Sequence, residues 1–293
     1  PAARDVSAKQ AFAARAVRPS LATAPTGPGS LIPSSYWGHV FVWDAGTARY
    51  VDGSASGGPA NGVRFTLYAL DPLTGEPATP LNAVGYADLT DQSTTSQYKL
   101  GVLVADATTT YADYLVTATT TSSSFFAQAT GFITDGTHRL DFSNSASVTT
   151  DQVGLDYSLA LSQPAVSAHL VATLAVGSST AVLTTTFGVT RGSETVVLSG
   201  TLTATQIQST FTASASFTVT VNGGAFATIT GTAQSGSSAS FTYVGPGRAL
   251  TQPEHAALDQ LFAAPGTLSS TIDGAFAPAE HLLGTSASLT LPS

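Results

Sequence analysis

The residue types that carry out nucleophilic catalysis occur in this chain without the spacing that such chemistry requires. Cysteine is absent, so a thiol nucleophile is excluded. Serine is abundant, but the stretch closest to a Gly-x-Ser-x-Gly nucleophile turn, Gly53-Ser-Ala-Ser-Gly57, has alanine at its centre. The five histidines show no signature spacing. We therefore expect no catalytic residue and no enzymatic activity.

Residues that could bind a metal ion are also present. His255 and Asp259 lie four residues apart on a predicted helix, and His281 follows Glu280, so two histidines and a carboxylate could converge on zinc. No His-Glu-x-x-His motif supports such a site. Four aspartates without the graded spacing of a calcium loop are further candidates: Asp88, Asp91, Asp135 and Asp141. We expect these groups to be solvated turn and helix residues, and we predict no metal and no cofactor.

Both tryptophans of the chain lie in one aromatic stretch, residues 36–44. If this stretch forms a strand, Trp37, His39 and Trp43 share one of its faces. Exposed rings at such positions could bind a polysaccharide by stacking on sugar rings. Large aromatic side chains are more typical of cores and subunit interfaces, so we favour a strand buried by its own domain or by a neighbouring subunit.

The charge of the chain is low and unevenly distributed. Charged residues make up 10% of the sequence, against about 25% in a typical protein. The net charge of −8 combines +3 on residues 1–18 with −11 on the remainder. An acidic body argues against a nucleic-acid partner and against anionic membrane surfaces. No run of about 18 apolar residues is present, so we predict no transmembrane helix.

Residues 1–35 are predicted to be a docking arm without a core of its own. Their first half is cationic, and residues 19–35 contain four prolines, which favour an extended chain. The arm could dock on a neighbouring subunit or fold back on its own body. The residues expected to supply charge and register are Arg4, Lys9, Phe12, Arg15, Arg18, Leu21, Leu31 and Ile32.

Residues 36–162 are predicted to form the first domain. Short alternating strands are separated by turn pairs such as Asn61-Gly62 and Asp135-Gly136, at a spacing typical of a sandwich of seven or eight strands. The stretch from Gly62 to Gly75, GVRFTLYALDPLTG, and the later strand Asp113-Tyr-Leu-Val-Thr-Ala118 resemble the immunoglobulin-like modules of bacterial surface proteins, including carboxypeptidase-regulatory-like modules. The resemblance implies an immunoglobulin-like β-sandwich with a scaffolding or adhesive role.

Residues 163–293 are predicted to form a long-stranded antiparallel meander with a helix at 252–264. The helix begins with Thr251-Gln-Pro-Glu254, which fits a capping box, and its apolar stripe is expected to include Ala257 and Leu258. A second short helix is expected near residues 278–283. The stretch 211–221 alternates Phe, Ala and Val with Thr and Ser, which predicts a strand with one buried face and one solvent-exposed face.

The turn after this strand, Asn222-Gly223-Gly224, is a strong hairpin signal. A two-residue turn would place Phe217 opposite Thr228, whereas a three-residue loop places it opposite Ile229. We predict the three-residue loop, with Gly224 in the left-handed region, because the apolar faces then agree.

An all-β chain with few charges on its strands and a cationic arm is typical of a protein whose sheet edges are used for assembly. The chain begins Pro1-Ala-Ala, as expected for a secreted protein after signal removal. We predict an extracellular or cell-surface structural subunit of a fibre or surface layer, which binds copies of itself through its arm and sheet faces. The alternative is a carbohydrate-binding or adhesive module that uses Trp37, His39 and Trp43.

Overall fold

The structure, a computed structural model, describes residues 29–71, 73–207, 210–235 and 240–266. They form fifteen strands, one short 3₁₀ turn (η1, Ser34–Tyr36) and one helix at 252–266. The strands are β1 His39–Asp44, β2 Arg49–Ser56, β3 Gly62–Tyr68, β4 Ala83–Asp91, β5 Tyr98–Ala105, β6 Thr110–Thr120, β7 Ser124–Thr134, β8 Arg139–Thr149, β9 Gln152–Leu161, β10 Val166–Val176, β11 Thr180–Arg191, β12 Glu194–Ile207, β13 Thr210–Val221, β14 Gly224–Gln234 and β15 Ser240–Val244.

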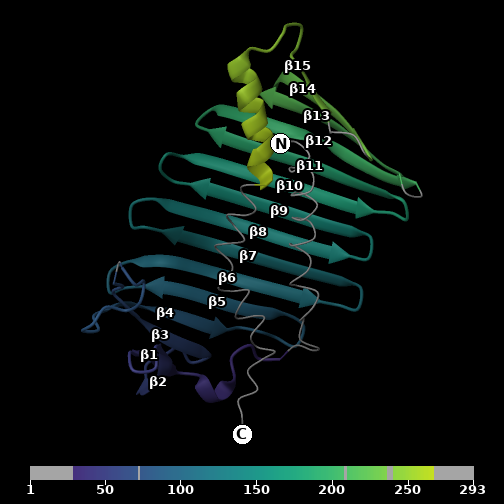
Figure 1. Ribbon diagram of the computed structural model, residues 1–293. Coiled ribbons are helices and arrows are strands. Elements are labelled where there is room, and N and C mark those ends of the chain that lie inside the picture. Colours follow the sequence, from purple (N-terminus) through teal and green to yellow (C-terminus); the bar gives the residue numbers. More distant parts are fainter. Residues whose placement is uncertain (1–28, 72, 208–209, 236–239, 267–293) are drawn as a thin grey trace.

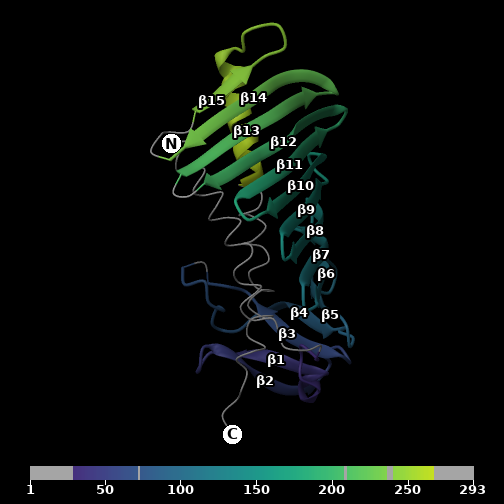
Figure 2. The same ribbon diagram turned by 90° about the vertical axis from the view of Figure 1, so that its right-hand side faces the viewer.

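All fifteen strands belong to one open sheet (Figure 1). From β4 to β15 each strand pairs with its chain neighbours, and at the other end β1 lies between β3 and β2. Among these fifteen strands, only the β1–β3 pair is parallel. The predominantly β character predicted from the sequence is confirmed. Figure 2 shows that the strand direction rotates along the sheet, as the intrinsic twist of strands requires.

The immunoglobulin-like sandwich predicted for residues 36–162 is not present among the described residues. β1 to β9 are consecutive members of the single sheet, so no second layer forms from them. Each connection from β3 onward leads to the adjacent strand position, whereas a sandwich needs connections that cross to another sheet. The proposed boundary after residue 162 falls in the turn between β9 and β10, which pair over ten residues from Val166↔Leu161 to Ala175↔Gln152.

The sheet has two chemically different faces. On β13 the side chains of Ala215, Phe217 and Val219 are buried, whereas the intervening Thr and Ser side chains are exposed. We call the first side the helix face, because the helix lies on it, and the second the hydroxyl face. The hydroxyl face of β13 and β14 consists of Thr212, Ser214, Ser216, Thr218, Thr228, Thr230 and Thr232.

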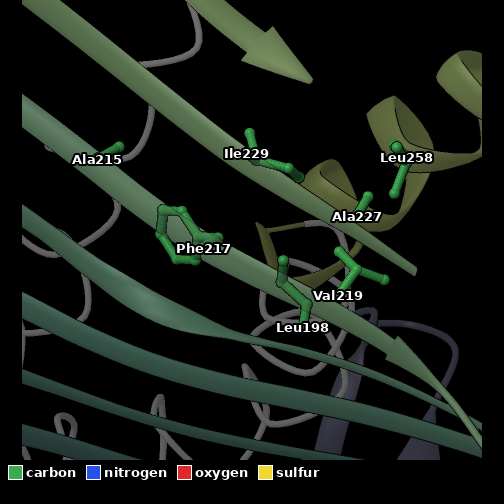
Figure 3. Packing of buried hydrophobic residues seen from close by; sticks show 7 residues of the cluster. All are labelled: Leu198, Ala215, Phe217, Val219, Ala227, Ile229 and Leu258. Carbon is green, nitrogen blue, oxygen red and sulfur yellow. The ribbon is translucent and has the colours of Figure 1, made fainter. Parts of the chain in front are cut away.

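The helix crosses several strands and covers one end of the helix face (Figures 1 and 2). Leu258 is 2% exposed and joins a buried cluster with Leu198, Phe217, Val219 and Ile229, shown in Figure 3. Further along the helix, Leu261 and Ala264 contact a second cluster. That cluster consists of Tyr157, Leu170 and Phe187 on β9 to β11. The predicted stripe is confirmed at Leu258 but wrong at Ala257, which is exposed.

The hairpin between β13 and β14 has the register predicted for the three-residue loop, but its turn is the two-residue alternative. The predicted pairs Phe217↔Ile229 and Val219↔Ala227 are confirmed. The three-residue loop is wrong, because Asn222 and Gly223 form a two-residue turn with φ of 52° and 78°. A bulge next to Val219 restores the register, so the tight turn and matching apolar faces coexist.

The helix begins with an interaction network around Glu254. Its carboxylate accepts hydrogen bonds from the Thr251 backbone N–H at 2.8 Å and from Arg248 Nη1 at 2.9 Å. The predicted role of Glu254 in a capping box is thereby confirmed at the Thr251 N–H. The Arg248 side chain, followed by the Thr251 contacts, lowers the pKa of Glu254 to about 2.

Because the folded-state pKa of Glu254 lies below its ordinary value of 4.5, the folded state gains stability above pH 4.5 and loses it as the pH falls toward 2. We expect Glu254→Gln to lower the unfolding midpoint in urea at pH 7 and to leave it nearly unchanged at pH 2. Glu76→Gln, in the β3–β4 loop, serves as the control. An equal fall of the urea midpoint at pH 7 and at pH 2 would show that the ionised Glu254 carboxylate does not stabilise the helix start.

Candidate functional site

The predicted arm residues Arg4, Lys9, Phe12, Arg15, Arg18 and Leu21 lie outside the described residues. Leu31 and Ile32 lie inside them, and both pack against a cluster of their own sheet that includes Val63 and Leu100. The Ile32 backbone N–H also donates to Asp91 Oδ2 at 3.1 Å. Burial raises the pKa of Asp91, but hydrogen bonds from Ser30, Ser93 and Ile32 outweigh it and leave the pKa lowered. The last residues of the predicted arm therefore dock on their own chain.

The three predicted aromatic-platform residues do not share one strand face. Trp37 precedes the strand and is 40% exposed, and its Nε1 donates to the Ile32 carbonyl at 3.0 Å. His39 and Trp43 lie on β1, where His39 Nδ1 is 2.7 Å from Asp52 Oδ2. Gly38 has a φ of 81°, which ends the extended chain between Trp37 and His39.

The rings near β1 pack against one another. Adjacent ring centroids along this chain of contacts are 5.2 to 6.0 Å apart, distances typical of aromatic packing. Its members are Trp43, Tyr50, Phe65, Phe41, Tyr36 and His39. All six are half-buried, and their mutual packing stabilises the β1–β3 end of the sheet.

The candidate metal ligands have other roles in the described part of the chain. His255 packs edge-on against the Tyr243 ring at 5.4 Å, and Asp259 accepts a hydrogen bond from the Tyr243 hydroxyl at 2.6 Å. Asp88 forms a bidentate ion pair with Arg64. Within residues 29–71, 73–207, 210–235 and 240–266, no three histidine or acidic side chains gather at one point. Glu280 and His281 lie outside these ranges.

Of the four aspartates expected to be solvated turn residues, Asp135 lies in the turn after β7 and Asp141 lies on β8 with its side chain half exposed. The expectation is wrong for Asp88 and Asp91, which are buried on β4. Asp135 accepts hydrogen bonds from the backbone N–H groups of Thr137 and His138, and these bonds and the His138 side chain hold its pKa far below the ordinary range. Asp141 pairs with Arg139 at 2.7 Å on the surface of the sheet. These carboxylates therefore act as turn acceptors and surface ion pairs.

A shallow hollow of about 340 Å³ lies on the hydroxyl face between β4 and β6. Gly101 lies in its lining, between Thr90 on β4 and Leu115 on β6. The acidic groups on its lining are Asp88, which is paired with Arg64, and the exposed Asp113.

The two edges of the sheet differ in how they are protected. At β2 the register shifts between Val40 and Phe41, and the strand carries Arg49 and Asp52. Bulges and charges of this kind are the usual protection of a sheet edge against pairing with another chain. We therefore expect β2 to resist pairing with a strand of another chain.

β15 is the unprotected edge. Its sequence, Ser-Phe-Thr-Tyr-Val, contains no charge, proline or glycine, and its β14 pairing from Thr228↔Val244 to Thr232↔Ser240 has no register shift. Among the described residues it pairs with β14 alone. After Val244 the chain leaves the sheet at Gly245-Pro246, because proline cannot donate to a ladder. No strand within residues 29–71, 73–207, 210–235 or 240–266 occupies the second side of β15, the side that strand addition would use.

Two side chains fix β15 to the helix. Phe241 packs against Phe262 with ring centroids 5.6 Å apart, and Tyr243 bonds to Asp259. Burial, followed by the hydrogen bond to the Asp259 carboxylate, raises the pKa of Tyr243 to about 12. The hydroxyl therefore stays protonated and keeps this bond at neutral pH. The edge strand is held in place in the free protein.

The chain matches no protein-family model, no curated protein and no solved structure. No described helix is both long and apolar enough to cross a membrane.

Proposed function

We propose that the protein is a structural subunit that assembles with copies of itself outside the cell, in a fibre or surface layer. The observation that carries the proposal is the open fifteen-stranded sheet that ends in an uncharged, unprotected strand, β15. Soluble proteins normally protect such an edge because it pairs readily with other strands. An edge that is both unprotected and fixed to a helix is suited to controlled strand addition.

Surface chemistry supports an extracellular role. With 10% charged residues, the protein relies on hydroxyl groups for solvation, and the exposed Thr and Ser side chains of β13 and β14 supply them. The proposal includes no catalytic step and no cofactor. The described part of the arm packs on its own sheet, so we assign the first contact between subunits to β15 and a supplementary contact to residues 1–28.

The alternative, a carbohydrate-binding or adhesive module, has less support. A stacking platform needs several exposed coplanar rings, whereas Trp43 packs edge-on against Tyr50 at 5.5 Å. Trp37, the most exposed of the proposed platform residues, is separated from the strand by Gly38. Binding of a polysaccharide by dispersed monomers would favour this alternative.

The test is sedimentation of the purified protein over a range of concentrations, with negative-stain imaging of the heaviest fraction. We expect concentration-dependent association in the wild type and its loss in Thr242→Lys, because a lysine on the edge strand opposes pairing. Thr230→Lys places the same charge on the hydroxyl face of β14, opposite Thr242. That control should associate like the wild type. A wild type that stays monomeric at every concentration would exclude the proposed function.

A further inference from the structure

β15 is complementary to itself when its direction is reversed. If two copies of Ser240–Val244 pair antiparallel around Thr242, Thr242 faces Thr242 and Phe241 faces Tyr243. The two aromatic residues lie on the helix face, where Phe241 and Tyr243 already contact the helix and its neighbouring cluster. The threonines lie on the hydroxyl face. Both aromatic and threonine cross-strand pairs are favourable in antiparallel sheets.

We propose that β15 pairs with β15 of a second copy of the chain about a two-fold axis at Thr242, which joins two sheets into one. This inference rests on the proposed function and names its partner and register. Centring the pair on Thr242 lets all five residues of each strand take part, whereas any other centre leaves residues unpaired. The contact is isologous, so both copies use the same surface.

The charges near β15 permit this contact. Arg248 is paired with Glu254, and Asp259 is bonded to Tyr243, so the charged groups nearest the edge already have partners. Each chain carries a net charge of −8, so two copies repel one another at a distance. Salt shortens the range of this repulsion, to about 8 Å at physiological ionic strength. We therefore expect added salt to strengthen the dimer.

The other edge is a poorer partner for β15. Pairing β15 with β2 of a second copy would produce an endless head-to-tail array, but the bulge beside Asp52 and the charge of Arg49 interrupt the β2 ladder. A five-residue strand pair is also short compared with a standard interface, so the β15 dimer should be weak and dependent on concentration.

The absence of cysteine makes the register directly testable. In the full chain, Thr242→Cys should form a disulfide-linked dimer under mild oxidation, because opposed Cα atoms in an antiparallel pair lie about 4.5–5.5 Å apart, within disulfide range. Ser240→Cys alone should stay monomeric, since its copy would be four residues away, about 13 Å. A mixture of Ser240→Cys and Val244→Cys should cross-link, because these residues face one another.

The outcomes separate this inference from the proposed function. Cross-linking by Thr242→Cys and by the mixture, but not by Ser240→Cys alone, supports the two-fold pair. If Ser240→Cys cross-links as readily as Thr242→Cys, the specific register is refuted. If the wild type associates but neither Thr242→Cys nor the mixture cross-links, the β15 pair is wrong and the assembling function stands. Circular dichroism of each variant checks that its sheet is intact.

Discussion

Leu258→Ala will lower the free energy of unfolding by about 2–5 kcal/mol, the range observed when a large buried aliphatic side chain is truncated. Leu258 is 2% exposed and is the fully buried residue through which the helix enters the cluster of β12, β13 and β14. Truncation leaves a cavity against Val219 and Ile229, both 1% exposed. Since whole domains are stable by only about 5–15 kcal/mol, this loss is a large fraction of the total.

Urea unfolding followed by circular dichroism measures the effect of Leu258→Ala. Gln260→Ala, on the exposed side of the same helix, is the matched control and should leave the unfolding free energy nearly unchanged. Hydrogen exchange adds a local readout, because release of the helix should reduce protection of β13 and β14 more than that of β6 and β7. Unchanged stability in Leu258→Ala would show that the helix does not contribute to the core.

Gly200→Ala will destabilise the protein by about 1–3 kcal/mol, the usual cost of an extra methyl group in a filled position. Gly200 pairs with Phe217 across β12 and β13. A Cβ atom at Gly200 would lie 2.2 Å from the Ser216 carbonyl oxygen and 2.6 Å from the Phe217 Cα. Because both of these are backbone atoms, the strand itself would have to move.

Gly224→Ala provides the matched control for this second prediction. Its Cβ would meet only the Val221 carbonyl oxygen, at an ordinary 3.4 Å. We therefore expect the same added methyl group to be neutral or slightly stabilising at Gly224, since it restricts the unfolded chain. Thermal unfolding of both variants tests the pair, and equal melting temperatures would contradict the close approach at Gly200.

Strand positions were the feature best predicted from sequence. The alternation of apolar and hydroxyl residues predicted strands close to fourteen of the fifteen observed ones, and it correctly paired Phe217 with Ile229. β2 was missed because Asp52 and Gly53 are poor strand residues, tolerated there at a bulged edge. Trp37 was placed on β1 because alternation runs through Gly38, whose positive φ breaks the strand.

Two features could not be predicted because they depend on the whole sheet. Alternation reveals which side chains share a face, but it does not reveal whether that face packs against a second sheet, a helix or a loop. The sandwich was predicted for that reason, whereas Leu31 and Ile32 cover the face near β3 and the helix covers it near β13. The edge position of β15 was also hidden, because it depends on Pro246 leading into a helix and not into another strand.

The connectivity of the sheet has a mechanical consequence. Among the described strands, each one from β4 to β15 is hydrogen-bonded only to its neighbours in the chain. The stability of such an array comes from contacts between adjacent strands, as the stability of repeat proteins comes from contacts between adjacent repeats. Under tension the sheet should therefore yield by peeling strands from one end, each releasing a short length of chain, instead of rupturing at once. A sheet of this design would be an extensible element that lengthens in steps under load.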